Sequence, residues 1–163
     1  EFLKGDVVIL YSDIIFEEKI IQQILESNDD ISIAIDMDWE KHYKHRSEHP
    51  ESEAENVLLD SEENIIEIKK NIKNEKMKIG EFLGIMKVTN QGSEIFVKKY
   101  EDISEKHEGN FHNASSISKA YLTDMLQELI DSKINIEPVF VEGKWCEIDT
   151  MQDLKIAEEL FNN

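Results

Sequence analysis

Apolar residues in the first part of this chain form two short continuous runs. Between these runs, apolar residues recur at the spacing of a helix. Residues 7–11 (VVILY) and 31–35 (ISIAI) form two such runs, and residues 16–27 between them carry isoleucines and a leucine at helical spacing. Continuous apolar strands are typical of sheets that helices cover on both faces. The pattern predicts a β-α-β unit in which residues 7–11 form a central strand parallel to residues 31–35.

The rest of the chain continues this mixture of strands and helices. Residues 56–59 and 65–68 flank polar turn residues and predict a hairpin. The other expected elements are a strand at 82–88, a helix at 118–131, strands at 134–141 and 144–148, and a helix at 150–161 that opens with a capping-box pattern. Together they predict a single α/β domain over residues 1–163, an α/β/α sandwich with a mixed, mainly parallel sheet.

The charge of the chain narrows the classes of function. Asp and Glu number 36 against 18 Lys and Arg, which gives a formal net charge of −18. An acidic surface repels a phosphate backbone, so we expect no nucleic-acid partner. No apolar run reaches the roughly 20 residues of a membrane span, so no membrane partner is expected. The single Cys146 cannot form an internal disulfide and should pack as a small hydrophobic residue, which fits a cytoplasmic protein.

Carboxylates at two strand ends are candidate metal ligands. Asp13 follows the first predicted strand, and ligands of open α/β sheets bind beyond such ends, although Asp13 could equally cap the next helix. Glu147 and Asp149 flank Ile148 on a strand and therefore project to one face. A divalent cation would relieve the repulsion between them. Two solvated acids are the alternative.

The polar segment at residues 36–55 is too long for a plain connection. It holds His42, His45 and His49 at spacings of three and four, which would align them on a helix and make a zinc site conceivable. Pro50 and the absence of a nearby cysteine favour solvated loop histidines instead.

Three stretches can be compared with known motifs. Residues 36–55 read DMDWEKHYKHRSEHPESEAE, residues 80–87 read GEFLGIMK, and residues 145–157 read WCEIDTMQDLKIA. They resemble the DxDWxxxYxxRxxHPxxEAE, GEFIGxxK and WxEIDTxxDLxxA motifs of nucleotidyltransferases associated with phosphoenolpyruvate mutase, a resemblance that runs over nearly the whole chain. It implies a partial Rossmann-like nucleotide-diphospho-sugar transferase (GT-A-like) fold. It also implies transfer of CMP from CTP to a phosphonate such as 2-aminoethylphosphonate, with phosphocholine as the alternative acceptor.

The resemblance also implies roles for individual residues. Asp13, which follows Ser12 where the family has glycine, matches an aspartate that binds Mg²⁺. Glu147 and Asp149 match the acidic pair that completes this metal site, and Lys70 matches a lysine that faces substrate phosphoryl oxygens. Mg²⁺ would neutralise the pyrophosphate leaving group, and no protein nucleophile is needed.

A zwitterionic acceptor would require a cation for its phosphonate and an acidic or aromatic surface for its ammonium group. Arg46 offers a planar fork to the phosphonate, and the acidic and aromatic residues of the same segment suit an ammonium group. A solvated loop is the alternative for this segment. The residues predicted to orient the acceptor are Asp36, Asp38, Trp39, Tyr43, Arg46 and Asp124.

One part of the family pattern is absent from this chain. No strand leads into a GxGxR loop, and the six glycines are dispersed. Without such a loop, positioning and charge stabilisation of the triphosphate are lost. We therefore expect the chain to be the C-terminal portion of such an enzyme, inactive in isolation, or else a non-catalytic remnant that binds a ligand or partner. A sheet edge left open by truncation predicts a homodimer.

Overall fold

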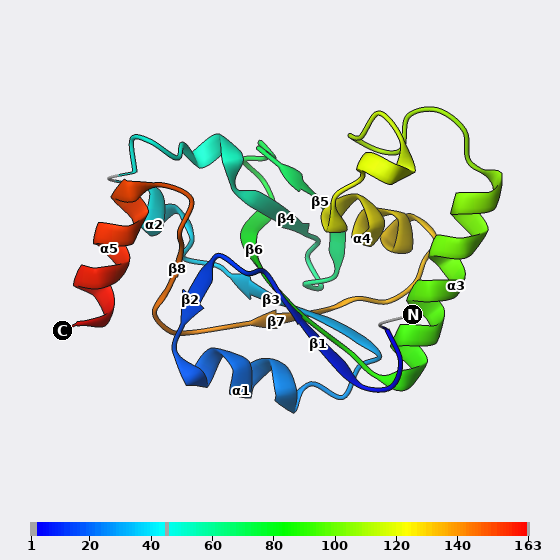
Figure 1. Ribbon diagram of the computed structural model, residues 1–163, viewed down its shortest axis with the longest axis horizontal. Coiled ribbons are helices and arrows are strands. Elements are labelled where there is room, and N and C mark those ends of the chain that lie inside the picture. Colours follow the sequence, from blue (N-terminus) through cyan, green and yellow to red (C-terminus); the bar gives the residue numbers. More distant parts are fainter. Residues whose placement is uncertain (1–2, 45, 163) are drawn as a thin grey trace.

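The computed structural model describes residues 3–44 and 46–162, which form an α/β/α sandwich (Figure 1). The strands of the main sheet are β1 (Val7–Leu10), β3 (Ile31–Asp36), β4 (Glu55–Leu59), β5 (Ile65–Lys70), β6 (Lys78–Val88) and β7 (Glu137–Phe140). A second, small sheet pairs β2 (Ile14–Phe16) with β8 (Trp145–Glu147). The helices are α1 (Glu18–Glu26), α2 (Glu40–Tyr43), α3 (Asn90–Lys106), α4 (Leu122–Asp131) and α5 (Met151–Phe161), with 3-10 turns η1 (Glu51–Glu53) and η2 (Ile117–Lys119).

The main sheet is mainly antiparallel, so the prediction of a mainly parallel sheet is wrong. Its order is β5-β4-β6-β3-β7, with β1 also paired to β6. Within the described ranges only β3 and β7 run parallel, and every other pair in this sheet is antiparallel. The long strand β6 lies between strands that run in the opposite direction. Apolar periodicity reveals a strand but not the direction of its neighbours, which is why the sequence misled here.

Strand β1 lies at an edge and not at the centre of the sheet. Its residues pair with β6 from Val88 to Ile85, and β6 separates it from β3. Alternate side chains face outward, and Val8 and Leu10 are 36% and 46% exposed. The predicted central position of this strand is therefore wrong, because a short apolar run does not say how many neighbours a strand has. Its predicted direction is confirmed, since β1 and β3 are both antiparallel to β6 and therefore run parallel to each other. A homodimer through this edge stays a prediction.

Helices cover both faces of the sheet, as predicted. The isoleucines of β3 pack with Phe96 of α3 and Leu126 of α4, whereas Ala34 between them packs with Ile20 of α1. Figure 1 shows α1 on one side of the sheet and α4 on the other. This division follows from the alternation of side chains along a strand.

Helix α3 was not predicted from the sequence. The Thr89 hydroxyl accepts a hydrogen bond from the backbone N–H of Gly92 at 3.1 Å, which caps the helix. Its buried side chains Phe96 and Ile103 are seven residues apart, and charged residues fill most of the positions between them. The apolar stripe is therefore too narrow to stand out as a periodic signal.

Other predicted elements are confirmed with shifted ends. Strands β4 and β5 form the expected hairpin, whose turn is held by the Asp60 carboxylate. Thr150 and Asp153 form the expected capping box of α5, with each side chain accepting a bond from the other's backbone N–H. Cys146 is buried, as expected. No helix in the described part of the chain has the length and apolar character to cross a membrane.

Gly84 in β6 allows a close contact that reaches the candidate site. Its φ of 67° is unfavourable for other residues, and a Cβ there would lie 2.3 Å from the Tyr11 ring. The Tyr11 backbone N–H donates to the Gly84 carbonyl at 2.9 Å. With its ring against this glycine, Tyr11 donates its hydroxyl to Glu55 Oε2 at 3.0 Å.

Candidate functional site

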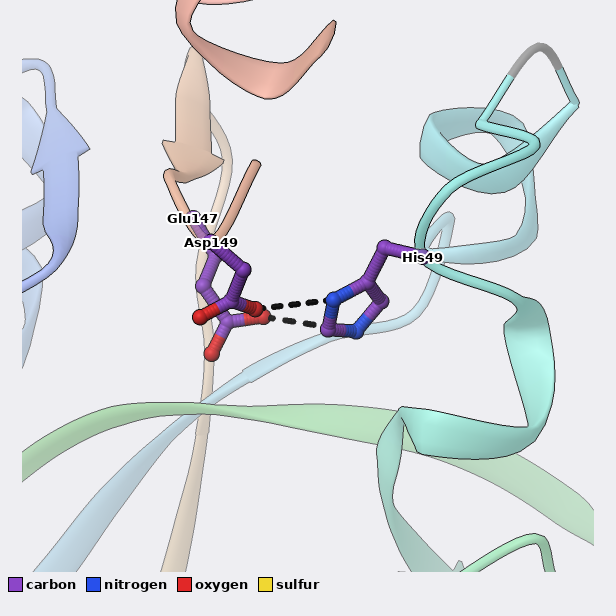
Figure 2. A group of neighbouring side chains, drawn as sticks. All are labelled: His49, Glu147 and Asp149. Atoms are coloured by element: carbon purple, nitrogen blue, oxygen red, sulfur yellow. Dashed lines mark ion pairs between the residues drawn. The ribbon is translucent and has the colours of Figure 1, made fainter. Parts of the chain in front are cut away.

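His49, Glu147 and Asp149 form a compact group of potential metal ligands. Figure 2 shows His49 pointing from the segment before η1 toward the two carboxylates at the end of β8. His49 Nδ1 lies 2.8 Å from Asp149 Oδ2, and His49 Nε2 lies 3.9 Å from Glu147 Oε2. One donor atom from each residue lies within 4.8 Å of the others. The structure therefore brings Glu147 and Asp149 together, and adds His49, which the sequence argument considered only as part of a zinc site of histidines.

Pairing of β2 with β8 holds the Asp13 backbone beside this group. Ile14 pairs with Glu147, and the Ile148 backbone N–H donates to the Asp13 carbonyl at 2.8 Å. The Asp13 side chain is exposed and does not belong to the compact donor group in the described structure. Its negative charge is nevertheless close enough to contribute to a raised pKa of Glu147. Asp13 as a metal ligand stays a prediction.

The electrostatics of this group favour a bound cation. Burial raises the pKa of Glu147 to about 7, and the negative charge of Asp149 adds to this, while Arg46 opposes it. The Nε2 atom of His49 is buried and has no hydrogen-bond partner among the described residues. A buried nitrogen without a partner and two carboxylates are donors that fit a divalent metal ion.

Four glutamates line a narrow cavity next to this group. Glu53, Glu55, Glu81 and Glu147 share its wall with aromatic and aliphatic side chains. Glu81 is only 4% exposed, and burial raises its pKa to about 8. The hydroxyl of Tyr43, which donates to Glu81 Oε1, opposes this rise, and the charge of Glu147 adds to it. The sequence argument assigned no role to Glu55 or Glu81, although both lie in the motifs at 36–55 and 80–87.

Arg46 does not present a free fork to an acceptor in this structure. Its Nε donates to Asp153 Oδ1 at 2.8 Å, and the two side chains are 3% and 0% exposed. The guanidinium carbon lies 5.0 Å from the centre of the Tyr43 ring. Arg46 thus joins the segment after α2 to the first turn of α5, and its predicted contact with the acceptor stays a prediction.

The aromatic residues of the same segment are also buried by the fold. Trp39 and Tyr43 are 5% and 6% exposed, and Trp39 Nε1 donates to the Ile79 carbonyl at 3.1 Å. Asp36 accepts from Trp145 Nε1 at 2.8 Å and pairs with His42 at 3.2 Å. Although burial opposes it, these hydrogen bonds lower the pKa of Asp36. The segment is therefore a packed part of the domain, and neither an aromatic face nor an unpaired Asp36 is exposed to solvent.

The other residues predicted to contact the acceptor or its phosphoryl group have partners within the protein. Asp38 pairs with Lys41 at the surface at 2.6 Å. Lys70 is half exposed and donates to Glu53 at 2.9 Å. Asp124 is buried, and its two oxygens accept backbone N–H groups of Tyr121, at the start of α4, and of Asn113, in the loop before it. Lys70 remains near the cavity wall through Glu53, whereas Asp124 acts as a helix cap.

The two described histidines of residues 36–55 have different partners. His42 pairs with Asp36 and its ring lies 4.6 Å from the ring of Trp145, centre to centre. His49 faces Glu147 and Asp149. His45 lies outside the described residues. The described histidines therefore do not form the zinc site considered for the segment, and only His49 joins a candidate donor group.

Divalent-metal binding tests the donor group directly. We expect Mn²⁺, titrated by calorimetry at neutral pH, to bind Asp149→Ala at least about tenfold more weakly than the unchanged protein, because a charged ligand is lost. The matched control is Asp131→Ala, an exposed carboxylate on α4. Equal Mn²⁺ affinity of Asp149→Ala and the unchanged protein would remove Asp149 from the site.

The chain is similar in sequence to a CTP-using enzyme. It is 27% identical over 156 residues to the CTP:phosphoglutamine cytidylyltransferase of Campylobacter jejuni subsp. jejuni serotype O:2, a match that covers 96% of this chain and 60% of that protein. No family model matches the chain. The chain thus spans less than two thirds of the length of this relative.

Two solved structures share the fold. The inositol-1-phosphate CTP transferase from T. maritima matches with a TM-score of 0.63 and 20% identity, over 98% of this chain and 56% of that one. A Bacillus anthracis protein assigned as a glucose-1-phosphate thymidylyltransferase, in complex with a sucrose, matches with a TM-score of 0.62 and 17% identity, over 96% of this chain and 55% of that one. The chain therefore has the nucleotide-diphospho-sugar transferase fold of nucleotidyltransferases and is similar in sequence to a cytidylyltransferase.

Proposed function

We propose that this chain is part of a cytidylyltransferase that moves CMP from CTP to a small acceptor with a phosphate or phosphonate group. The observation that carries the proposal is the convergence of His49, Glu147 and Asp149 in a chain that is similar to a cytidylyltransferase over 96% of its length. Nucleotidyl transfer requires a site that gathers charge-neutralising groups around phosphoryl oxygens. A donor group of this composition suits that requirement.

The reaction needs no covalent intermediate with the protein. An oxygen of the acceptor forms a bond to the α-phosphorus of CTP while the bond from that phosphorus to the bridging oxygen breaks, and pyrophosphate leaves with the bonding electrons. Glu147 and Asp149 would hold Mg²⁺, which when bound supplies positive charge beside the phosphoryl oxygens. His49 fixes the Asp149 carboxylate through Nδ1. Ordered ligands of this kind raise the rate by positioning.

The identity of the acceptor is a more specific part of the proposal. The motif at residues 36–55 led us to 2-aminoethylphosphonate, with phosphocholine as the alternative, and the Campylobacter relative is named for phosphoglutamine. All three compounds carry a phosphoryl group and a nitrogen-bearing chain. We take 2-aminoethylphosphonate as the first acceptor to test.

Pyrophosphate release tests the transferase. The natural full-length polypeptide that carries this sequence, supplied with CTP, Mg²⁺ and 2-aminoethylphosphonate, should release pyrophosphate and form a cytidylyl product visible by phosphorus NMR. Asp149→Asn should lower kcat/KM by at least about 100-fold, since metal-held charge contributes several kcal/mol to such reactions. Asp131→Asn is the matched control and should retain activity.

Two results would contradict this proposal. One is the absence of turnover with 2-aminoethylphosphonate, phosphocholine and phosphoglutamine, which would favour the non-catalytic alternative. The other is a clear preference for UTP or dTTP over CTP.

A further inference from the structure

The cavity beside the donor group is lined by carboxylates that come from separate parts of the chain. Glu55 begins β4, Glu81 lies in β6, and Glu147 ends β8. No lysine or arginine lines this cavity in the described structure. Three basic side chains near the cavity have acidic partners: Arg46 pairs with Asp153, His49 with Asp149 and Lys70 with Glu53. Three converging carboxylates therefore have no cation of the protein inside the cavity.

Glu81 carries a buried oxygen that lacks a partner. The residue is 4% exposed, and its Oε1 accepts the hydroxyl of Tyr43. Its Oε2 is buried and accepts no hydrogen bond from any described residue. A buried carboxylate oxygen without a donor is costly, so a ligand that donates to it would be strongly favoured.

Part of the cavity lining is apolar and aromatic. Ile14, Phe82, Leu83 and Trp145 lie there, together with the Tyr11 ring that packs against Gly84. Such a wall suits the methylene groups and the positive charge of an organic amine. Apolar and aromatic side chains do not suit a hydrated divalent ion, because they offer no hydrogen-bond acceptors to its bound waters.

The size of the cavity restricts the cation further. Its free volume is about 20 Å³, which is enough for one group of the size of a water molecule. A primary ammonium group is about that size and has three N–H donors. A trimethylammonium group is several times larger and has no donor for Glu81 Oε2.

We propose that Glu55, Glu81 and Glu147 bind the primary ammonium group of the acceptor in this cavity. The inference rests on the proposed function for the identity of the acceptor. Because Glu147 lines the cavity and also belongs to the donor group with Asp149, an acceptor with ammonium and phosphoryl groups a few bonds apart could occupy both. The cavity selects primary amines and excludes quaternary ones, so phosphocholine is disfavoured as an acceptor.

Equilibrium binding without CTP tests this ammonium subsite. The probes are 2-aminoethylphosphonate, ethylphosphonate, which lacks the ammonium group, and phosphocholine, titrated by calorimetry into the 163-residue chain with Mg²⁺ at neutral pH. We expect 2-aminoethylphosphonate to bind at least about tenfold more tightly than either other probe, because neither of the others has an N–H group to donate to the glutamates. The bound ammonium group would itself favour the ionised form of these carboxyls. Glu81→Gln should abolish this preference while leaving ethylphosphonate binding unchanged. Glu62→Gln, an exposed glutamate in the β4–β5 turn, should retain it.

Three results would overturn the subsite: no saturable binding of 2-aminoethylphosphonate, equal affinity for 2-aminoethylphosphonate and ethylphosphonate, or an unchanged preference in Glu81→Gln. Circular dichroism of the variant checks that it is folded. The proposed subsite and the proposed transferase activity can be refuted independently of each other. A preference for the amine without pyrophosphate release removes only the transferase, whereas turnover without any preference for the amine removes only the subsite.

Discussion

Arg46→Ala should lower the free energy of unfolding by about 3 to 5 kcal/mol, the usual cost of removing one partner of a buried ion pair. The Arg46 and Asp153 side chains are 3% and 0% exposed and lie 2.8 Å apart. Asp153 Oδ2 keeps its bonds to the Thr150 hydroxyl and backbone, but Oδ1 loses its charged donor. The buried charge is then only partly compensated. The attachment of α5 to the segment after α2 should weaken with it.

Urea unfolding measures this effect. Trp39 and Trp145 are both buried, so their fluorescence should report the transition. Lys41→Ala is the control, because its pair with Asp38 is exposed and should contribute less than about 1 kcal/mol. If Arg46→Ala unfolds within about 1 kcal/mol of the unchanged protein, the pair does not hold the domain together. A direct role of Arg46 toward the acceptor would then deserve renewed testing.

Glu81→Gln should make the protein more stable at alkaline pH. Burial raises the pKa of Glu81 in the folded state from 4.5 to about 8. Between these values the folded state binds a proton that the unfolded state has released, so stability falls as the pH rises through this window. The amide resembles the protonated acid and does not titrate. We expect a gain of about 2 to 4 kcal/mol at pH 9 and little change near pH 4.5.

The measurement is the free energy of unfolding at a series of pH values from 5 to 9. Some dependence on pH should persist in the variant, because Glu147 faces the same cavity and its pKa is raised to about 7. Glu62→Gln should follow the unchanged protein throughout. An identical slope in Glu81→Gln and the unchanged protein would show that Glu81 does not hold a proton in the folded state.

Local patterns in the sequence were enough to predict several elements of the fold. The hairpin of β4 and β5 depends on turn residues between two apolar runs, and the start of α5 depends on Thr150 and Asp153 only three residues apart. Both patterns involve residues that are close together in the sequence, so the sequence alone is enough to recognise them. Helix α3 was missed because its buried stripe is sparse and its stability comes from packing against the sheet.

The sequence also predicted that Glu147 and Asp149 would share one face, because the alternation of a strand requires it. It did not predict that His49, about 100 residues earlier in the chain, would join them. Nor could it place Glu55, Glu81 and Glu147 around one cavity, since these residues lie on different strands. Which strands are neighbours depends on the pairing of the whole sheet.

The sequence by itself determined the mixed α/β composition, the acidic pair and the motifs of a nucleotidyltransferase, because each depends on residues close together in the chain. Only the tertiary structure decided that β1 lies at an edge and that Arg46 pairs with Asp153. The sequence around an arginine in a polar segment does not show whether the arginine binds a ligand or pairs with a buried aspartate. The choice depends on where α5 packs, and that is fixed by contacts between parts of the chain far apart in sequence.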